Sequence, residues 1–147
     1  MANKHVIFWS VALAVFILDR VSKFFVLKFI PLNSSIDFPI FSLTHVLNTG
    51  TAFGILKNAS WFFVIFAAAV SVFLILKYRT FSLDLQPLLG LILGGAVGNL
   101  LDRLLYGAVI DFVDFHFWPA FNIADSAISI AVVLLLWREY KPRKRNI

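Results

Sequence analysis

The sequence predicts an all-α integral membrane protein, a four-transmembrane-helix bundle with a small β-sheet on its outer face. Two observations of composition and pattern support this prediction. Of the 147 residues, 61% are hydrophobic and only 14% are charged, whereas an average soluble domain carries about 25% charged residues. The apolar residues also fall into four stretches, each close to the length of roughly 20 residues that a bilayer core requires.

The four predicted spans cover residues 6–25, 58–76, 85–105 and 121–137. Pro87 lies near the start of the third span, where the first helical turn tolerates proline. The first span is not expected to be a cleavable signal peptide, because it lacks a small-residue cleavage site and runs into Asp19 and Arg20. We therefore expect residues 1–147 to form a single membrane-embedded domain.

The distribution of basic residues predicts the orientation of these spans. Four spans place both termini on one side, where Lys4, the loop with Lys77 and Arg79, and the C-terminal cluster share eight basic residues. The opposite side holds the remaining five, and three of these lie within motifs or at helix ends. The positive-inside bias then places both termini in the cytoplasm. The net charge of +5 thus indicates orientation in a membrane, and no nucleic-acid partner is expected.

A long outer segment, about residues 28–57, separates the first two spans. It contains Pro31, Pro39 and a turn signal at Asn48-Thr49-Gly50. The runs 40–47 and 51–56 on either side of this turn favour short strands, which predicts a small sheet at the outer membrane surface. The residues before Asn58 are equally compatible with a short interfacial helix, and the sequence leaves this choice open.

Polar residues within the spans gather at one depth. They are Asp19 and Lys23 in the first span, Asn99, Asp102 and Arg103 in the third, and Asn122 and Asp125 at the start of the fourth. In the predicted topology these three helix ends all lie outside. A charge in lipid costs several kcal/mol unless it is paired or hydrated, so such a cluster is a functional candidate.

Each of these groups also has a purely structural explanation. Asp19 and Lys23, four residues apart, share a helix face and can pair. The three residues of the third span can lock that helix end, and Asn122 can cap the fourth helix with Asp125 in its first turn. A bundle this small does not need so many polar groups to fold, so together they favour a functional site.

Three kinds of chemistry compete for this cluster. A Ser/His hydrolase has His116 as its only plausible base, and the chain has no Gly-x-Ser-x-Gly elbow. A metal site from Asp111, Asp114 and His116 is a weak pattern, since it offers one histidine and two loop carboxylates. A carboxylate pair acting on water needs two aspartates from different segments, and Asp125 with Asp111 or Asp114 meets that need. Without cysteine, thiolate chemistry is excluded.

Two other classes of protein explain the positions of the polar residues less well than a hydrolase does. A small channel or transporter with a carboxylate proton relay predicts polar residues at several depths, whereas here they gather at one end. An assembly or scaffold protein does not need two unpaired carboxylates in a membrane. Both classes are therefore disfavoured.

Five motifs in order across nearly the whole chain resemble those of the lipoprotein signal peptidases, also called signal peptidase II. They are Asp19-Arg20-Val21-Ser22-Lys23, Asn48-Thr49-Gly50-Thr51-Ala52-Phe53-Gly54, Gly94-Gly95-Ala96-Val97-Gly98-Asn99-Leu100-Leu101-Asp102-Arg103, Val109-Ile110-Asp111-Phe112 and Phe121-Asn122-Ile123-Ala124-Asp125. One such motif is a weak signal, but five in order across four spans are a strong one.

The resemblance implies an intramembrane aspartic peptidase whose catalytic dyad is Asp111 and Asp125, with no cofactor and no metal. The implied supporting and substrate-binding residues are Asp19, Lys23, Asn48, Asn99, Asp102, Arg103 and Asn122. The implied substrate is a prolipoprotein whose lipobox cysteine carries diacylglycerol, cleaved just before that cysteine. The implied location is the bacterial cytoplasmic (inner) membrane, with the active site near the outer face. We expect a monomer in contact with membrane lipid.

Overall fold

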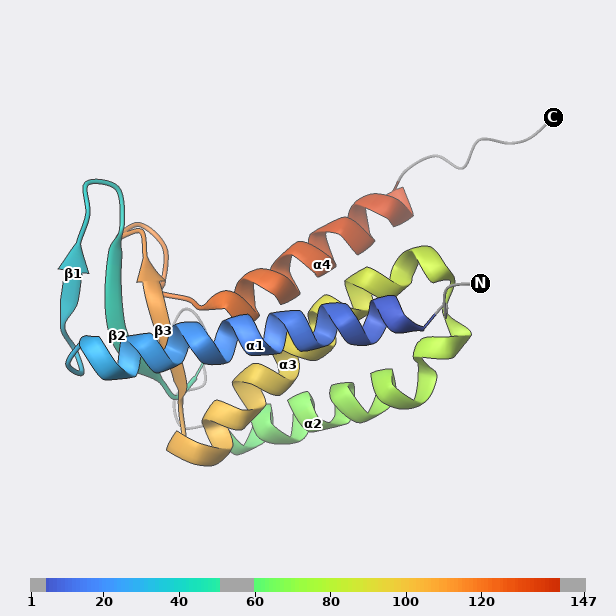
Figure 1. Ribbon diagram of the computed structural model, residues 1–147, viewed down its shortest axis with the longest axis horizontal. Coiled ribbons are helices and arrows are strands. Elements are labelled where there is room, and N and C mark those ends of the chain that lie inside the picture. Colours follow the sequence, from blue (N-terminus) through green and yellow to red (C-terminus); the bar gives the residue numbers. More distant parts are fainter. Residues whose placement is uncertain (1–4, 51–59, 141–147) are drawn as a thin grey trace.

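The computed structural model describes residues 5–50 and 60–140, and the structural statements below concern these residues. They form four long helices and a three-stranded sheet at one end of the helices (Figure 1). The elements are α1 (Val6–Phe29), β1 (Ser35–Asp37), β2 (Ser42–Asn48), α2 (Ser60–Lys77), the 3-10 turns η1 (Tyr78–Thr80) and η2 (Leu83–Leu85), α3 (Gln86–Tyr106), β3 (Val109–Asp114) and α4 (Ile123–Tyr140).

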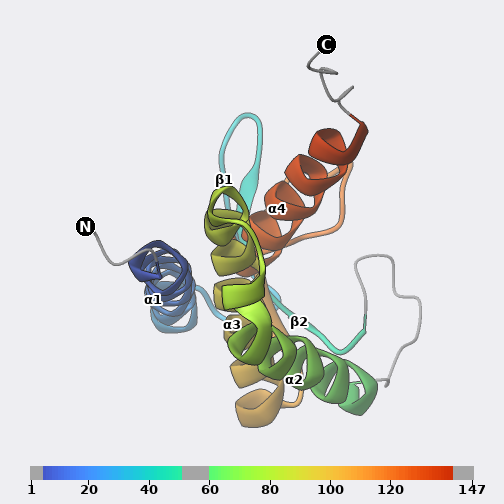
Figure 2. The ribbon, with the colours of Figure 1, turned by 90° about the vertical axis from the view of Figure 1, so that its right-hand side faces the viewer.

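Helix α3 is the central element, and α1, α2 and α4 are arranged around it (Figure 2). Adjacent glycines allow two of these neighbours to approach closely. A Cβ at Gly94 would lie 2.5 Å from the Ala12 carbonyl oxygen of α1, and one at Gly95 would lie 2.6 Å from the Ala124 carbonyl oxygen of α4. Both distances are shorter than any real Cβ contact, so the packing of α3 against α1 and α4 depends on residues without side chains.

The sheet is antiparallel, with strand order β1-β2-β3. Its register is irregular between Leu43 and Val46 of β2. Strand β3 joins the sheet to the helices, because Ile110 and Phe112 are buried against Val26 and Ile30 at the end of α1. The sheet is therefore fixed to the same helix end that carries the polar cluster.

Large apolar side chains are exposed on all four helices, for example Leu13, Phe66, Leu105 and Val133. An apolar surface of this extent indicates an environment of lipid rather than water. The segments Ser60–Thr80 and Leu83–Tyr106 are long and apolar enough to cross a membrane. Helices α1 and α4 have 24 and 18 residues, but they also contain charged residues of the polar cluster.

The prediction that Asp111 and Asp114 lie in a loop is wrong, because both belong to β3. The strand was missed since residues 109–112 are all buried, and a strand buried on both faces does not show alternating polarity. The predicted strand at 40–47 is confirmed as β2. The predicted strand at 51–56 and the alternative interfacial helix lie outside the described residues, as do the start of the second span at 58–59 and most of the C-terminal basic cluster.

Candidate active site

Four charged side chains form a compact, nearly buried cluster between α1 and α3. Lys23 Nζ lies 2.9 Å from Asp19 Oδ2 and 2.6 Å from Asp102 Oδ2, and it also donates a 3.0 Å hydrogen bond to Asn99 Oδ1. One terminal nitrogen of Arg20 bridges the same two carboxylates at 2.8 and 2.6 Å. Two positive and two negative charges balance, which is what makes their burial tolerable. The predicted pairing of Asp19 with Lys23 is confirmed.

Each carboxylate of this cluster also holds the backbone next to one candidate catalytic aspartate. Asp19 Oδ1 accepts a 3.1 Å hydrogen bond from the N–H of Ala124, which precedes Asp125. Asp102 Oδ2 accepts one of 3.2 Å from the N–H of Ile110, which precedes Asp111. The charge cluster therefore fixes the positions of α4 and β3 relative to α1 and α3.

The start of α4 is held by a reciprocal capping arrangement. Asn122 Oδ1 accepts a 2.9 Å hydrogen bond from the N–H of Asp125, and Asp125 Oδ2 accepts a 3.3 Å hydrogen bond from the N–H of Asn122. A side-chain acceptor before the helix and a carboxylate three residues later satisfy two helix-end donors at once. The structural explanation for Asn122 is confirmed, yet the same side chain also contacts Asp111.

Asparagine amides orient the carboxylates of Asp111 and Asp125. Asp111 accepts hydrogen bonds from Asn48 Nδ2 at 2.9 Å and from Asn122 Nδ2 at 2.8 Å. Asp125 Oδ1 accepts one from Asn99 Nδ2 at 2.7 Å. A neutral amide fixes a carboxylate without adding the positive charge that holds it ionised. Asn99 links the two groups of residues, because its oxygen accepts from Lys23 and its nitrogen donates to Asp125.

The electrostatic environment of Asp111 favours its protonated form. Burial, and then the neighbouring charge of Asp125, raise the pKa of Asp111 to about 7, against the opposing effect of the hydrogen bonds from Asn48 and Asn122. At neutral pH this carboxyl can therefore both hold and release a proton. That is the property required of a general acid or base.

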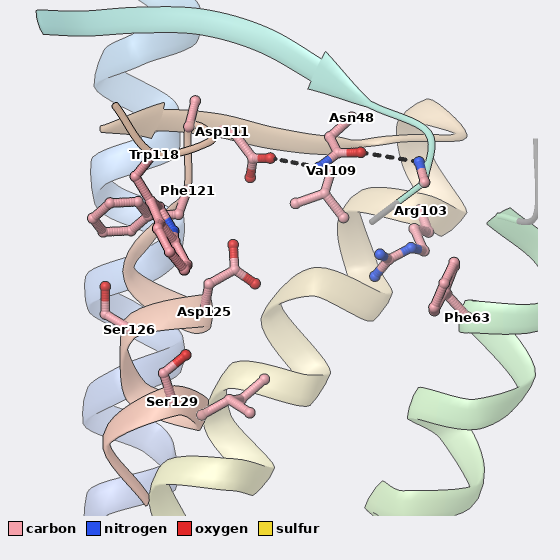
Figure 3. A pocket seen from close by; sticks show the side chains of 13 residues that line it. Asn48, Phe63, Arg103, Val109, Asp111, Trp118, Phe121, Asp125, Ser126 and Ser129 are labelled. Carbon is pink, nitrogen blue, oxygen red and sulfur yellow. Dashed lines mark hydrogen bonds between the residues drawn. The ribbon is translucent and has the colours of Figure 1, made fainter. Parts of the chain in front are cut away.

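Both aspartates face one cavity of about 530 Å³, from β3 and from α4 (Figure 3). Residues of α2, α3, β2 and the segment between β3 and α4 complete its lining. They include Phe63, Arg103, Asn48, Trp118 and Phe121. The cavity is thus mostly apolar, with two carboxylates and one guanidinium at defined positions, the usual composition of a ligand site.

Arg103 and Asp102 are consecutive residues near the end of α3, but their side chains contact different groups. Asp102 turns toward Lys23 and Arg20, whereas Arg103 faces the cavity and packs over the ring of Phe63 at 5.2 Å (Figure 3). Consecutive helical residues point about 100° apart, so the two side chains serve different surfaces. Arg103 Nε is buried and has no hydrogen-bond partner among the described residues.

Asp114 and His116, the residues of the alternative metal or Ser/His site, do not lie at this cavity. Asp114 contacts the backbone N–H of His116 at 2.7 Å, and the His116 ring lies near Ser42 at 3.3 Å. Neither Asp114 nor His116 lines the cavity. Across residues 5–50 and 60–140, no three His, Cys, Asp or Glu side chains are grouped closely enough to hold a metal ion.

One residue of the charge cluster was not singled out by sequence reasoning. Arg20 is not among the predicted supporting residues, but it bridges Asp19 and Asp102 and donates a 3.2 Å hydrogen bond to the Gly98 carbonyl oxygen. Its position inside the Asp19–Lys23 motif was the available signal. Its partner Asp102 is 82 residues away in sequence, and spacing cannot predict a contact over that separation.

The fold and the site together define a class: a membrane protein with two hydrogen-bonded aspartates on one largely apolar cavity. Residues 11–141 match the family model of signal peptidase (SPase) II. The chain belongs to this family, and it is a peptidase of the aspartic type that processes lipoproteins.

Curated relatives and solved structures agree with this assignment. The lipoprotein signal peptidase of Syntrophomonas wolfei is 48% identical over 134 residues, covering 88% of this chain and 89% of the relative. That of Thermodesulfovibrio yellowstonii is 43% identical over 135 residues, covering 86% and 90%. A bacterial membrane enzyme solved by the in meso method at 2.3 Å resolution has a TM-score of 0.82 and 31% identity, covering 93% of this chain and 92% of its own.

Proposed function

We propose that this protein is an intramembrane aspartic endopeptidase that removes the signal peptide of diacylglyceryl-modified prolipoproteins, just before the lipidated cysteine. The observation that carries the proposal is the placement of Asp111 and Asp125 on one cavity (Figure 3). Among the described residues, neither aspartate forms a salt bridge, and the side chains that hydrogen-bond to them are asparagines. Two adjacent carboxylates so held can share one proton.

In the proposed mechanism Asp111 begins protonated and Asp125 begins ionised. The raised pKa of Asp111 supports this assignment, and the N-terminal dipole of α4 favours negative charge on Asp125. Asp125 takes a proton from water as the water oxygen attacks the scissile carbonyl carbon, and Asp111 gives its proton to the carbonyl oxygen. When the tetrahedral intermediate collapses, Asp111 recovers its proton and Asp125 protonates the departing amine, so the proton count balances.

The other polar residues have supporting roles in this proposal. Asn48, Asn99 and Asn122 orient the dyad, while Asp19, Lys23 and Asp102 hold the elements that carry it. Arg103 is placed to contact the substrate, because its side chain faces the cavity. No metal or other cofactor takes part.

We further propose that all four helices cross the bacterial inner membrane, with both termini in the cytoplasm and the site near the outer face. The apolar exposed surfaces of α1 and α4 support four spans, and the basic loop with Lys77 and Arg79 supports the orientation. A signal peptide is itself an apolar helix, so a site at this depth meets its cleavage point within the membrane. The diacyl chains of the substrate remain in lipid, and residues 1–147 act as one monomeric domain.

The direct test is cleavage in vitro by the purified full-length protein. A precursor peptide with a diacylglyceryl cysteine and the same peptide without lipid are incubated separately, and the products are identified by mass spectrometry. We expect a single cut before the cysteine in the lipidated peptide, little cut in the other, and no effect of a chelator. Equal cleavage of both peptides would contradict the substrate assignment, and loss of activity on chelation with recovery on adding a divalent ion would contradict the mechanism.

A further inference from the structure

A second cavity is lined by residues around the start of α1 and by η1, the turn that follows α2. The start of α1 and the end of α2 lie at the opposite end of the helices from the sheet (Figure 1). Its volume is about 360 Å³. It is lined by His5, Val6, Trp9, Ser10, Leu13, Tyr78 and Arg79. The proposed peptidase activity makes no use of these residues.

Tyr78 lines this cavity, and its side chain is held by several contacts. Its ring stacks on Phe8 with centroids 4.4 Å apart, and the His5 ring meets it edge-on. The hydroxyl oxygen accepts hydrogen bonds from Trp9 Nε1 at 3.2 Å and from Arg79 Nε at 3.1 Å. With both acceptor positions used, the hydroxyl proton is left to donate, although the Tyr78 residue is only 6% exposed.

Arg79 is held in the same way and also keeps free donors. Its guanidinium lies over the Tyr78 ring at 5.6 Å, and its Nε is used in the bond to Tyr78. Among the described residues, no hydrogen bond or salt bridge involves its two terminal nitrogens. The buried His5 Nδ1 likewise has no partner within the described part of the chain. No Asp or Glu is among the described lining residues, so the cavity presents donors and a positive charge.

The outer wall of the cavity is apolar. Val6, Trp9 and Leu13 are 52%, 44% and 59% exposed, and Ile17 continues the row of Trp9 and Leu13 along the lipid-facing side of α1. Trp and Tyr at a helix end are typical of the membrane interface, because one end of each side chain is apolar and the other end can be hydrated. The cavity therefore combines a positive charge and free donors with an apolar, lipid-facing wall.

We propose that this cavity binds the headgroup of an anionic phospholipid, with its phosphate at Arg79, Tyr78 and His5 and an acyl chain along Trp9, Leu13 and Ile17. The matching features are one cation, several unused donors and a lipid-facing apolar wall. Basic pockets between transmembrane helices are known to suit such headgroups. The site is independent of the dyad and does not rest on the peptidase proposal.

Native mass spectrometry of the full-length protein in detergent tests this inference. Dioleoyl phosphatidylglycerol, dioleoyl phosphatidylcholine and glycerol 3-phosphate are titrated separately, and the apparent Kd of the first bound molecule is measured. We expect phosphatidylglycerol to bind about fivefold or more tightly than the other two, since the site combines charge recognition with an acyl track. Equal binding of phosphatidylcholine would overturn the recognition of negative charge. Equal binding of glycerol 3-phosphate would show a free-phosphate site and overturn the lipid assignment.

Single substitutions test whether phosphatidylglycerol binds at this second cavity. Arg79→Gln should weaken phosphatidylglycerol binding about fivefold, while the matched control Lys77→Gln, which removes the same charge from a residue outside the cavity lining, should change it less than about twofold. Tyr78→Phe keeps the stacked ring and removes only the hydroxyl, so it should also weaken binding, and it serves if Arg79→Gln misfolds by circular dichroism. Asp111→Asn should bind lipid as the unmodified chain does. Unchanged binding in both cavity variants, or an equal loss in Lys77→Gln, would overturn the proposal.

Discussion

At the scale of single residues, the aspartates of the site differ in the kind of side chain that binds them: some contact cationic side chains and others contact asparagine amides. Lys23 and Arg20 contact Asp19 and Asp102 directly, and this pairing gives the two carboxylates a structural role. Among residues 5–50 and 60–140, the hydrogen bonds to the proposed dyad come from neutral groups. In the proposed mechanism, carboxylates of the same chemical type thus take structural or reactive roles according to their partners.

The raised pKa of Asp111 predicts how activity depends on pH. In the proposed mechanism the competent state holds one proton on the dyad. Because the pKa of Asp111 is raised to about 7, that proton is retained below neutral pH and lost as the pH rises through about 7. We expect a bell-shaped profile of kcat/KM whose alkaline limb lies near neutrality, with two apparent constants that belong to the pair. Activity that stays constant from pH 5 to about 10 would contradict a shared proton.

Substitution of Asn48 should shift the alkaline limb of the pH profile. Its hydrogen bond to Asp111 stabilises the carboxylate and lowers the pKa of that group. Asn48→Ala should therefore raise the pKa of Asp111 and shift the alkaline limb of the pH profile upward, with a loss of rate from poorer orientation. Asp114→Asn, outside the cavity, is the control and should leave the limb in place. A downward shift in Asn48→Ala would show that the contact acts differently.

At the scale of secondary-structure elements, the charge cluster joins four elements that are distant in sequence. Asp19 connects α1 to the start of α4, and Asp102 connects α3 to β3. The aspartates of the proposed dyad, Asp125 and Asp111, are the next residues on each of the two elements so held. The contacts that fix the two elements thus lie one residue away from the proposed reacting groups.

Lys23→Met should therefore cost both stability and activity. The substitution keeps the apolar length of the side chain but leaves Asp19 and Asp102 with one cation between them. Breaking a buried ion pair typically costs about 3–5 kcal/mol. A thermal unfolding scan in detergent should show a clear loss of stability, whereas Lys77→Met, at an exposed position, should not. Unchanged stability in Lys23→Met would mean that the cluster is not needed to hold the fold.

Gly95→Ala tests the close approach of α3 and α4. The added methyl would meet the Ala124 carbonyl oxygen at 2.6 Å, so α4 must shift, and with it Asp125. We expect a marked fall in the rate of cleavage, with only a small loss of thermal stability. Gly107→Ala is a contrasting control, because its Cβ meets nothing within 4 Å and only its φ of 71° is strained, at a cost of about 1–2 kcal/mol. If Gly107→Ala harmed kcat as much as Gly95→Ala, displacement of Asp125 would not be the cause.

At the scale of the whole molecule, the polar cluster, the sheet and the first cavity lie at one end of the helices, and the basic loop lies at the other (Figure 1). This separation underlies the proposed orientation in the membrane. Because the chain has no cysteine, single cysteines report accessibility without background. Ser35→Cys should react with an impermeant reagent added to intact spheroplasts, and Ser82→Cys should react only after lysis. The opposite pattern would invert the topology.

The sequence was sufficient to predict the features that depend on local chemistry. Helices long enough for a bilayer, the pairing of Asp19 with Lys23 and the cap by Asn122 follow from spacing along one segment. Contacts between segments were not predictable in this way, including the bridge from Arg20 to Asp102 and the hydrogen bonds to Ala124 and Ile110. Strand β3 was missed for a related reason, because its burial comes from packing against α1 rather than from its own pattern.

The most direct test of the central claim is the cleavage of a lipidated precursor by Asp111→Asn, Asp125→Asn and the double variant. Asparagine keeps the size of each side chain but cannot exchange a proton. Each single variant should lose at least about 10³-fold in turnover while still binding the lipidated peptide, and the double variant should be little worse than either, because residues that act as a unit are not additive. Substantial cleavage by either single variant would contradict the proposed dyad. If Asp114→Asn abolished cleavage at the same time, Asp114 would take the place of Asp111.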